Sequence, residues 1–369
     1  MRRIAALLVV AAIAAVAVSL AVRSGRHSDH PAARSTTAPA PPPRPRPHPS
    51  GPRSVVHDGR ILLDGKPFFP ILQWLQCPHK MNESVRLGIT VFLSGECSGS
   101  DRAVLAATSR RGVFSVLRVP AVLHVGSSLI GWYFQDEPDG HGIPPSTIAK
   151  EYAQVRGHGL AFLNLNLVAW RPQLSTRVYK QYARSTDLLG AGAYPVTGWC
   201  RPDWLARVGE TQRALVALAD GRPTYQWIEA SATSLQYCAG RGVTPDELRA
   251  EVWDAIVNGA KAIGYFTHSW TPTYDQFRVS PDVQAEIKRT NTQIGMYTKA
   301  ILGTPVPLRI TRQGGRIEAM ARRAGGTLYL FAVNVDRTPA AAILTLDGKK
   351  LRLSLPPLGV SIGPAASSR

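Results

Sequence analysis

Eight short apolar segments recur between residues 69 and 267, and stretches with helical patterning separate them. The segments are 69–72, 90–93, 113–119, 129–134, 161–167, 188–193, 223–228 and 262–267. The segment 129–134 is apolar and aromatic without alternation, which is typical of a strand covered on both faces. Eight strand–helix units predict an α/β fold, the (β/α)8 TIM barrel. A doubly wound sheet would also alternate, but no glycine-rich phosphate loop follows the first strand.

Local signals support this arrangement at two places. The clearest helix pattern covers 244–258, where Thr244 is the expected N-cap and Glu247 completes a capping box. Two Asp-Gly turns, at 58–59 and 64–65, flank the apolar residues 61–63. They predict a small hairpin in front of the barrel.

The pattern changes after a helix expected around 281–301. Short β-rich segments follow at 316–319, 328–335, 341–346 and 351–355, separated by Gly-Gly and Asp-Gly turns. They predict a barrel domain at 54–305 and a small all-β, sandwich-like domain at 306–369. The β domain contains no cluster of acid, base and nucleophile. We expect it to pack on the barrel, with sugar binding as the alternative.

The N-terminal region has the composition of a targeting segment. Two arginines precede the 19 residues 4–22, which are apolar except for Ser19. Residues 1–23 are therefore expected to be a signal peptide or membrane anchor, and their length favours the anchor. Residues 24–53 form a linker, because eight of the fourteen positions from 39 to 52 are proline. We expect an exported protein, extracellular or at the cell surface, that meets the membrane through its N-terminal segment.

The formal net charge of +18 is unevenly placed, since eight arginines and one aspartate give +7 within residues 1–53. The remaining positive charge is dispersed and forms no Lys/Arg stripe interleaved with aromatic residues. Nucleic acid is therefore not an expected partner. A diffuse positive field is better suited to an anionic cell envelope or an acidic polysaccharide.

If the chain is exported, its four cysteines are candidates for disulfide bonds, because disulfides form outside the cytosol. The strand assignment places Cys77 and Cys97 in loops after neighbouring strands, and Cys200 and Cys238 likewise. It predicts the pairs Cys77–Cys97 and Cys200–Cys238, with free buried thiols as the alternative. No two cysteines have the spacing of zinc ligands, and no motif indicates a cofactor, so neither is expected.

Two glutamates end predicted strands in similar contexts. Glu137 follows the fourth strand in a Gln-Asp-Glu-Pro motif, and Glu229 ends the seventh after Tyr225 and Trp227. Ligands bind at the carboxyl ends of barrel strands. Cleavage of a glycosidic bond needs a proton donor and a second carboxylate. The pair therefore predicts glycoside hydrolysis, with Glu137 as a donor whose pKa is raised by burial and by Asp136, and Glu229 as nucleophile.

On these motifs the chain resembles the clan A glycoside hydrolases, retaining TIM-barrel glycosidases that include cellulase-like and β-galactosidase-like enzymes. In those families the acid/base glutamate ends strand four, usually in Asn-Glu-Pro, and the nucleophile ends strand seven. Glu137 and Glu229 stand at the matching positions. Asp136 replaces the usual asparagine, so Asp136 or Asp139 stays open as the acid. The resemblance implies a retaining hydrolase that cleaves an extracellular or cell-envelope glycan by double displacement.

Further residues at strand ends are expected to contact an oligo- or polysaccharide. They are Asp136, Tyr194, Trp270, His268, Gln73, Trp74 and Glu96. A flat ring such as that of Trp270 can stack on the apolar face of a sugar. The resemblance implies substrate-contacting aromatics at Trp270 and Tyr194. The alternatives are a non-catalytic glycan-binding or envelope scaffold protein on the same barrel, an inverting hydrolase and a transglycosylase.

Overall fold

The computed structural model describes residues 51–97, 100–120, 123, 126–166, 174–233 and 240–365. These residues belong to one compact unit. The expected signal or anchor at 1–23, and the linker up to residue 50, lie outside the described residues. Within the part of the chain that is described, no helix is long and apolar enough to cross a membrane.

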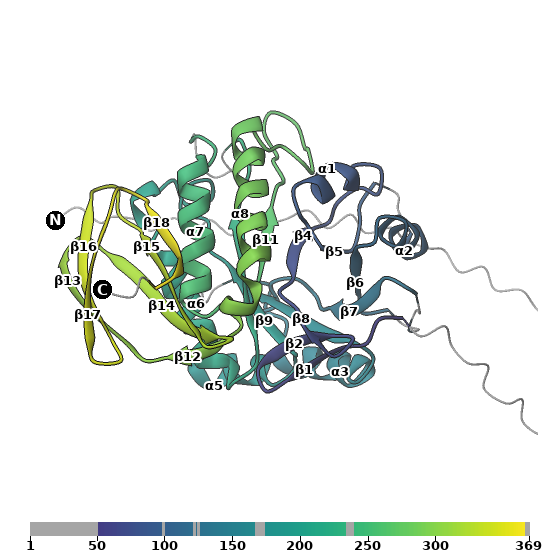
Figure 1. Ribbon diagram of the computed structural model, residues 1–369. Coiled ribbons are helices and arrows are strands. Elements are labelled where there is room, and N and C mark those ends of the chain that lie inside the picture. Colours follow the sequence, from purple (N-terminus) through teal and green to yellow (C-terminus); the bar gives the residue numbers. More distant parts are fainter. Residues whose placement is uncertain are drawn as a thin grey trace, which may run out of the picture. The chain divides into compact units, whose positions relative to one another are not determined.

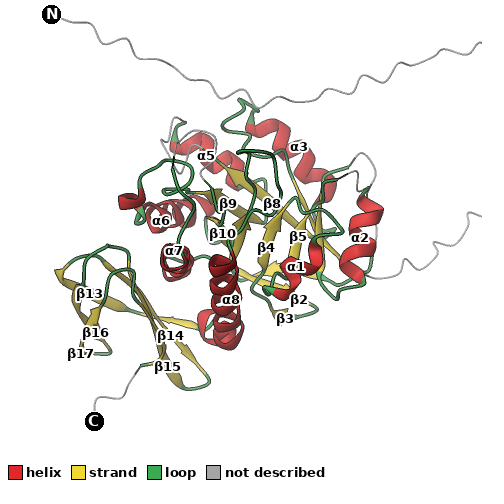
Figure 2. Ribbon diagram, turned by 90° about the horizontal axis from the view of Figure 1, so that it is seen from above, coloured by secondary structure: helices red, strands yellow, loops and turns green. Residues whose placement is uncertain are grey.

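Eight parallel strands close into a barrel in the order of the chain, which confirms the predicted fold class. They are β4 (Ile71–Trp74), β5 (Val91–Leu93), β6 (Phe114–Arg118), β7 (Leu129–Tyr133), β8 (Leu160–Leu165), β9 (Leu188–Gly192), β10 (Thr224–Glu229) and β11 (Ala262–Phe266). Each end lies within about two residues of the prediction, the usual uncertainty of a strand boundary. Figure 2 shows the strands at the centre with the helices around them.

The helices follow the strands along the chain (Figure 1). They are α1 (Met81–Arg86), α2 (Asp101–Ser109), α3 (Pro145–Val155), α5 (Thr176–Ala183), α6 (Arg207–Ala219), α7 (Pro245–Val257) and α8 (Pro281–Ile301), with the 3₁₀ turn η1 (Pro202–Trp204). The predicted capping box begins α7, where the Thr244 hydroxyl accepts a hydrogen bond from the Glu247 amide. The described residues between β6 and β7 form no helix, which departs from the expected eight strand–helix units.

Aromatic rings fill the barrel interior, and glycines on the neighbouring strands leave room for them. A Cβ atom at Gly190 would lie 2.2 Å from the Tyr225 ring, and one at Gly264 would lie 2.2 Å from the Trp227 ring. Any side chain larger than hydrogen would therefore clash in this closely packed interior. The glycines of β9 and β11 are thus complementary to the aromatic residues of β10.

The predicted hairpin is present and extends to a third strand. It consists of β1 (Ser54–His57), β2 (Arg60–Leu63) and β3 (Lys66–Pro67), paired antiparallel. Both residues of each Asp-Gly turn have positive φ, for example 48° at Asp58 and 67° at Gly59, as in a type I′ turn. Ile61 is buried with the barrel-interior residues Leu72 and Phe162. The small sheet therefore packs against the amino ends of the barrel strands.

The C-terminal domain consists of two antiparallel sheets, as predicted for a sandwich. The sheet β12-β14-β15-β18 contains Thr304–Val306, Ile317–Ala324, Thr327–Asn334 and Val360–Pro364, and the sheet β13-β16-β17 contains Leu308–Gly314, Ala340–Leu346 and Lys349–Leu355. The sequence did not predict β12, β13 and β18. Proline occurs in β12 and β18, and β13 is largely exposed and polar, so none has a continuous apolar run.

The β domain packs on the outer helices of the barrel. Trp253 of α7 stacks on Phe331 of β15 with ring centroids 5.9 Å apart. Phe331 and Val333 share one buried cluster with Ile256 of α7 and Ile294 of α8. The expected packing role is therefore confirmed.

Candidate active site

The loops that follow three barrel strands begin with a backbone conformation that is rare outside glycine. The φ angle is +36° at Leu75 after β4, +57° at Ser94 after β5 and +46° at Glu137 after β7. Side chains with a Cβ atom occupy this left-handed region at a cost, and such strain concentrates at functional sites. All three residues lie on the face where the carboxyl ends of the strands meet.

Two asparagines hold the carboxyl groups that follow β7. The Asn164 amide donates to Asp136 Oδ1 at 2.9 Å, and the Asn166 amide donates to Glu137 Oε2 at 2.6 Å. The asparagines follow the apolar part of β8 two residues apart, so their side chains leave the strand on the same side. The end of β8 therefore fixes both carboxyl groups of the predicted catalytic motif.

The surroundings of Glu137 favour its protonated form. Burial raises the pKa of Glu137, and the negative charge of Asp136 raises it further, to about 8, against the opposing hydrogen bond from Asn166. Burial also raises the pKa of Asp136 above its ordinary value. A carboxyl group that keeps its proton at neutral pH can act as a general acid.

Asp139, the alternative acid, is more deeply buried. Its Oδ1 accepts a hydrogen bond from the backbone amide of Asn166 at 2.9 Å. Asp139 and Glu137 thus both bind Asn166, one through its backbone and one through its side chain. In the structure Asp139 joins the loop after β7 to the end of β8.

Tyr194 lies near all the carboxyl groups of the predicted mechanism. Its ring lies over Gly192, where a Cβ atom would be 2.6 Å away, and stacks on Phe266 at 5.5 Å. Burial raises the pKa of Tyr194 well above its ordinary value, and the charges of Glu137, Asp136 and Glu229 raise it further. The hydroxyl therefore stays protonated and can donate a hydrogen bond.

Glu229 ends β10 as predicted, but its side chain is enclosed, with an exposed fraction of 1%. Its Oε1 accepts from the Val196 amide at 2.7 Å, and its Oε2 accepts from the Thr197 amide at 2.5 Å and from the Thr197 hydroxyl. Burial and the charge of Glu229 raise the pKa of Glu251 of α7 well above its ordinary value. These surroundings favour a protonated Glu251, and the nucleophilic role of Glu229 stays a prediction.

Exposed aromatic rings continue from Phe266 towards solvent. Trp270 stacks on Phe266 at 5.7 Å and lies 5.9 Å from Tyr274. The exposed fractions of Trp270 and Tyr274 are 41% and 46%. His268, between them, is buried, and burial lowers its pKa to about 4, so it is neutral at pH 7. Flat exposed rings of this kind can stack on a sugar.

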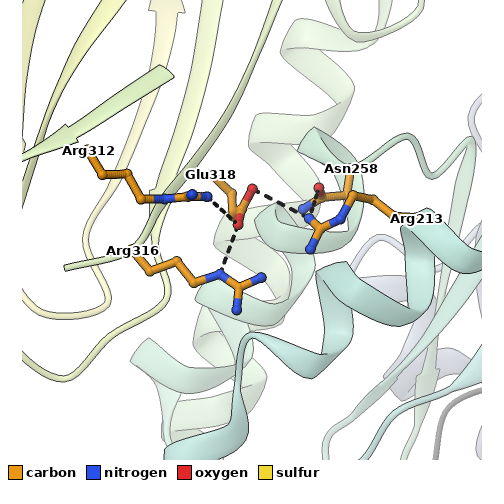
Figure 3. Close-up of a pocket in the computed structure, with 5 residues that line it drawn as sticks. All are labelled: Arg213, Asn258, Arg312, Arg316 and Glu318. Atoms are coloured by element: carbon orange, nitrogen blue, oxygen red, sulfur yellow. Dashed lines mark hydrogen bonds and ion pairs between the residues drawn. The ribbon is translucent and has the colours of Figure 1, made fainter. Parts of the chain in front are cut away.

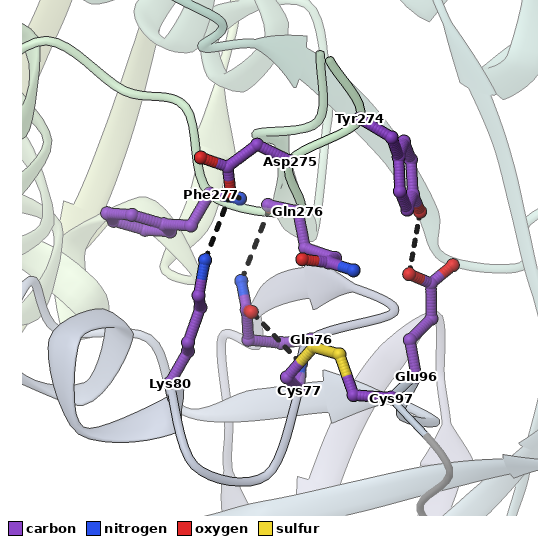
Figure 4. Close-up of a disulfide and its surroundings, with 9 residues drawn as sticks. All are labelled: Gln76, Cys77, Lys80, Glu96, Cys97, Tyr274, Asp275, Gln276 and Phe277. Atoms are coloured by element: carbon purple, nitrogen blue, oxygen red, sulfur yellow. Dashed lines mark hydrogen bonds and ion pairs between the residues drawn. A yellow bond between two sulfur atoms is a disulfide. The ribbon is translucent and has the colours of Figure 1, made fainter. Parts of the chain in front are cut away.

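A disulfide and two polar contacts brace this aromatic segment (Figure 4). Cys77 and Cys97 are bonded, with Cα atoms 5.4 Å apart, which confirms the first predicted pair. The Tyr274 hydroxyl donates to Glu96 at 2.6 Å, and Lys80 pairs with Asp275 at 3.0 Å. The loops after β4, β5 and β11 are therefore tied together. Cys238 lies outside the described residues, so the second pair, Cys200–Cys238, stays a prediction.

Two predicted contact residues have different surroundings. Trp74 is partly buried at the top of the barrel interior, with its ring edge-on to Tyr133 at 5.5 Å and to Trp227 at 5.7 Å. Gln73 is fully buried and donates to the Thr267 hydroxyl at 3.1 Å. It faces away from the barrel interior, so the structure does not bring Gln73 to the other site residues.

The structure thus forms two adjoining groups, joined by the stack of Tyr194 on Phe266. The first is a carboxylate cluster that consists of Asp136, Glu137, Tyr194 and Glu229. The second is an aromatic cluster that consists of Glu96, His268, Trp270 and Tyr274. Sequence reasoning missed Asn164, Asn166, Phe266 and Tyr274. The two asparagines had a signal, since they interrupt the apolar segment 161–167 at its end with the period of a strand.

No family model matches the sequence, and no curated protein matches it. Solved structures do match its fold. An α-amylase from Geobacillus thermoleovorans has a TM-score of 0.55 at 9% identity, covering 81% of this chain and 99% of that one. A GH42 β-galactosidase from G. stearothermophilus has a TM-score of 0.55 at 8% identity, covering 80% and 98%. A glycoside hydrolase family 5 protein from Bacteroides vulgatus has a TM-score of 0.50 at 13% identity, covering 85% and 90%.

At such low identity these likenesses show the fold. They agree with the closed barrel and the C-terminal sheets described above. The chain has the (β/α)8 barrel fold of these TIM-barrel glycoside hydrolases.

Proposed function

We propose that this chain is a glycoside hydrolase that uses Glu137 as its acid/base. The observation that carries the proposal is the Glu137 carboxyl group, held by Asn166 beside Asp136 with a pKa raised to about 8. It lies at the carboxyl ends of the strands, where catalytic groups of TIM barrels are found. The structural neighbours are glycoside hydrolases, which supports the same activity.

The proposed reaction is a double displacement with retention. Glu137 gives its proton to the leaving oxygen while the glycosidic C–O bond breaks and Glu229 forms a bond to the anomeric carbon. Glu137, now a carboxylate, then takes a proton from water, whose oxygen attacks that carbon and releases Glu229. The buried contacts of Glu229 set a condition: one of its oxygens must leave Val196 or Thr197 to reach the substrate.

The proposed substrate is an extracellular or cell-envelope glycan. The apolar segment at 4–22 and the proline-rich linker support export and tethering to the membrane. The exposed rings of Trp270 and Tyr274 supply a surface on which a sugar can stack.

Two matched variants of the full chain test the mechanism on aryl glycosides and wall polysaccharides. Glu229→Gln should abolish turnover of every cleaved substrate, because no nucleophile remains. Glu137→Gln should keep kcat/KM for aryl glycosides with strongly acidic leaving groups, since these leave without protonation, and should lose most of it on natural linkages. Its kcat should fall on both kinds of substrate, because the variant also lacks the base that deprotonates water in the second step. Undiminished turnover in Glu229→Gln would refute the nucleophile, and an equal loss of kcat/KM on all substrates in Glu137→Gln would refute the proton donor.

The enclosure of Glu229 favours a second candidate, a non-catalytic glycan-binding protein on the same barrel. With an exposed fraction of 1% and hydrogen bonds to two backbone amides, Glu229 can serve to hold the loop after β9. In that case the wild-type chain binds an oligosaccharide without cleaving it. Trp270→Ala then weakens binding, while Glu137→Gln and Glu229→Gln change it little.

A further inference from the structure

A second set of converging polar residues lines a pocket between the barrel helices and the β domain. The lining consists of Arg213 from α6, Asn258 at the end of α7, Arg312 from β13, Arg316 just before β14, and Glu318 from β14. Figure 3 shows Arg312 and Arg316 approaching Glu318 from one side and Arg213 from the other. The two parts of the chain thus contribute guanidinium groups to one pocket.

The positive charges exceed the negative ones in this pocket. Glu318 lies 3.4 Å from Arg213, 3.1 Å from Arg312 and 2.9 Å from Arg316. Arg316 has a second acidic partner, Glu210, at 2.8 Å, which Arg207 in turn contacts at 3.1 Å. Four arginines therefore share two carboxylates. Each guanidinium carries five N–H donors, so these contacts leave donors for a ligand.

In this pocket the acidic side chain is buried and two of the arginines reach solvent, as a binding site for an anion requires. Glu318 is mostly buried, while the exposed fractions of the Arg213 and Arg312 side chains are 44% and 49%. Asn258 orients Arg213 by accepting a hydrogen bond from its Nη1 at 2.5 Å. The acidic group thus lies at the base of the arginine cluster, and the guanidinium groups are accessible from solvent.

The pocket is separate from the candidate active site. Helices of the barrel run antiparallel to its strands, so the end of α7 at Asn258 lies near the amino end of β11. Glu137 and Tyr194 lie at the opposite, carboxyl ends. Binding at the pocket and catalysis at the candidate active site can therefore be measured independently.

We propose that this pocket binds an oxyanion of an acidic glycan, a carboxylate or a phosphate group, through Arg213, Arg312 and Arg316. The guanidinium fork matches both groups in a bidentate geometry. Pockets between two structural parts are common ligand sites. The site would hold an acidic polymer beside the barrel whether or not the chain cleaves it, so the proposal does not depend on the glycosidase activity.

Isothermal titration of the full chain with three probes tests this site: inorganic phosphate, a glucuronic-acid oligosaccharide and a neutral oligosaccharide. The variants are Arg213→Gln and Arg312→Gln, with Arg323→Gln as the control. Arg323 lies on the same β domain, its side chain has an exposed fraction of 46%, and it pairs with Asp347 outside the pocket. All three variants remove one positive charge and keep most of the side-chain stem.

We expect at least one acidic probe to bind the wild type, and each pocket variant to weaken it by roughly tenfold, the equivalent of one lost charge-assisted hydrogen bond. Arg323→Gln should stay within about twofold, a difference near the resolution of such affinities. The probe that binds identifies the group as phosphate or carboxylate. Equal weakening in the control would assign the effect to the diffuse positive field and overturn the proposal. So would the absence of binding by both acidic probes, which would leave the ion pairs a structural link.

If a pocket variant unfolds, Arg312→Lys keeps the charge beside Glu318 and replaces the fork by a single ammonium group. We expect this variant to keep the wild-type melting temperature and still to lose most of the affinity for the acidic probe. Wild-type affinity in folded Arg312→Lys would contradict bidentate recognition by Arg312.

Discussion

A buried and a partly buried glutamate of this chain have opposite electrostatic surroundings. Glu247, at the start of α7, binds Arg241 at 2.5 and 2.7 Å and also binds Arg337 of the β domain. Burial raises the pKa of Glu247, but the hydrogen bonds from the two arginines outweigh it and lower the pKa to about 2. Glu137 instead binds the neutral amide of Asn166, and its pKa rises to about 8.

Burial raises the pKa of both carboxyl groups, and only the hydrogen bonds from the two arginines of Glu247 overcome it. The chain has 43 lysines and arginines, so the neutral partner of Glu137 does not reflect a shortage of cations. A charged glutamate between two arginines serves as a structural link between barrel and β domain. A protonated glutamate beside a second carboxyl group is suited to acid catalysis.

The largest expected effect is the loss of catalysis in Glu137→Gln. On a natural glycan we expect kcat to fall by about 10³, within the range for removal of a general acid. The neutral amide preserves the size of the side chain, so the circular dichroism spectrum should not change. The exposed Glu83 of α1 supplies the control, and Glu83→Gln should keep wild-type kcat. A comparable loss in both variants would mean that the effect is not specific to the site.

The next largest effect concerns the structural glutamate. Glu247→Ala leaves Arg241 and Arg337 without their buried partner, so we expect the free energy of unfolding to fall by about 3–5 kcal/mol. Urea denaturation followed by fluorescence measures it, and Glu83→Ala should change the same quantity by less than about 0.5 kcal/mol. A small change in Glu247→Ala would mean that the junction does not depend on this ion pair.

The contributions of the two glutamates to the free energy of unfolding should depend on pH in opposite directions. Glu247 has a lowered pKa, so its contribution is present above the ordinary value of 4.5 and is lost as pH falls from 4.5 towards 2. Glu137 has a raised pKa, so its contribution is present below 4.5 and is lost as pH rises from 4.5 to about 8. Urea unfolding of the wild type and Glu137→Gln across pH 4–9 measures the difference. An identical slope in both would contradict the raised pKa.

The smallest expected effect is on substrate stacking. Trp270→Ala removes an exposed ring, and we expect KM to rise about two- to tenfold with kcat nearly unchanged. Tyr274→Phe keeps its ring and loses only the hydrogen bond to Glu96, so its KM should change less. A larger effect of Tyr274→Phe than of Trp270→Ala would mean that the hydrogen bond, rather than stacking, orders this segment.

The fold could be predicted closely because its signals are local. Strands covered on both faces leave continuous apolar runs, and the capping box at Thr244 and the Asp-Gly turns fix their own boundaries. The disulfide Cys77–Cys97 followed from the adjacency of β4 and β5. The strands β12 and β18 contain proline and gave no such signal.

The site could be predicted less fully, because its contacts join distant segments. The strand count placed Glu137 and Glu229 at strand ends. It could not show that Asn166 would reach Glu137, or that Val196, Thr197 and Glu251 would enclose Glu229. Those contacts depend on the course of loops and on how α7 lies against β10. Tyr274 was missed for the same reason, since only the fold of its loop brings it to Glu96.

The central claim is that Glu137 carries a proton at neutral pH, and it can be measured without knowing the substrate. Carboxyl ¹³C chemical shifts of glutamate-labelled protein, followed from pH 3 to 10, give the titration of Glu137 as the signal that is missing in Glu137→Gln. We predict a midpoint of about 8 for that signal. A midpoint near the ordinary value of 4.5 would contradict the account, because Glu137 would then be ionised at neutral pH and could not donate a proton.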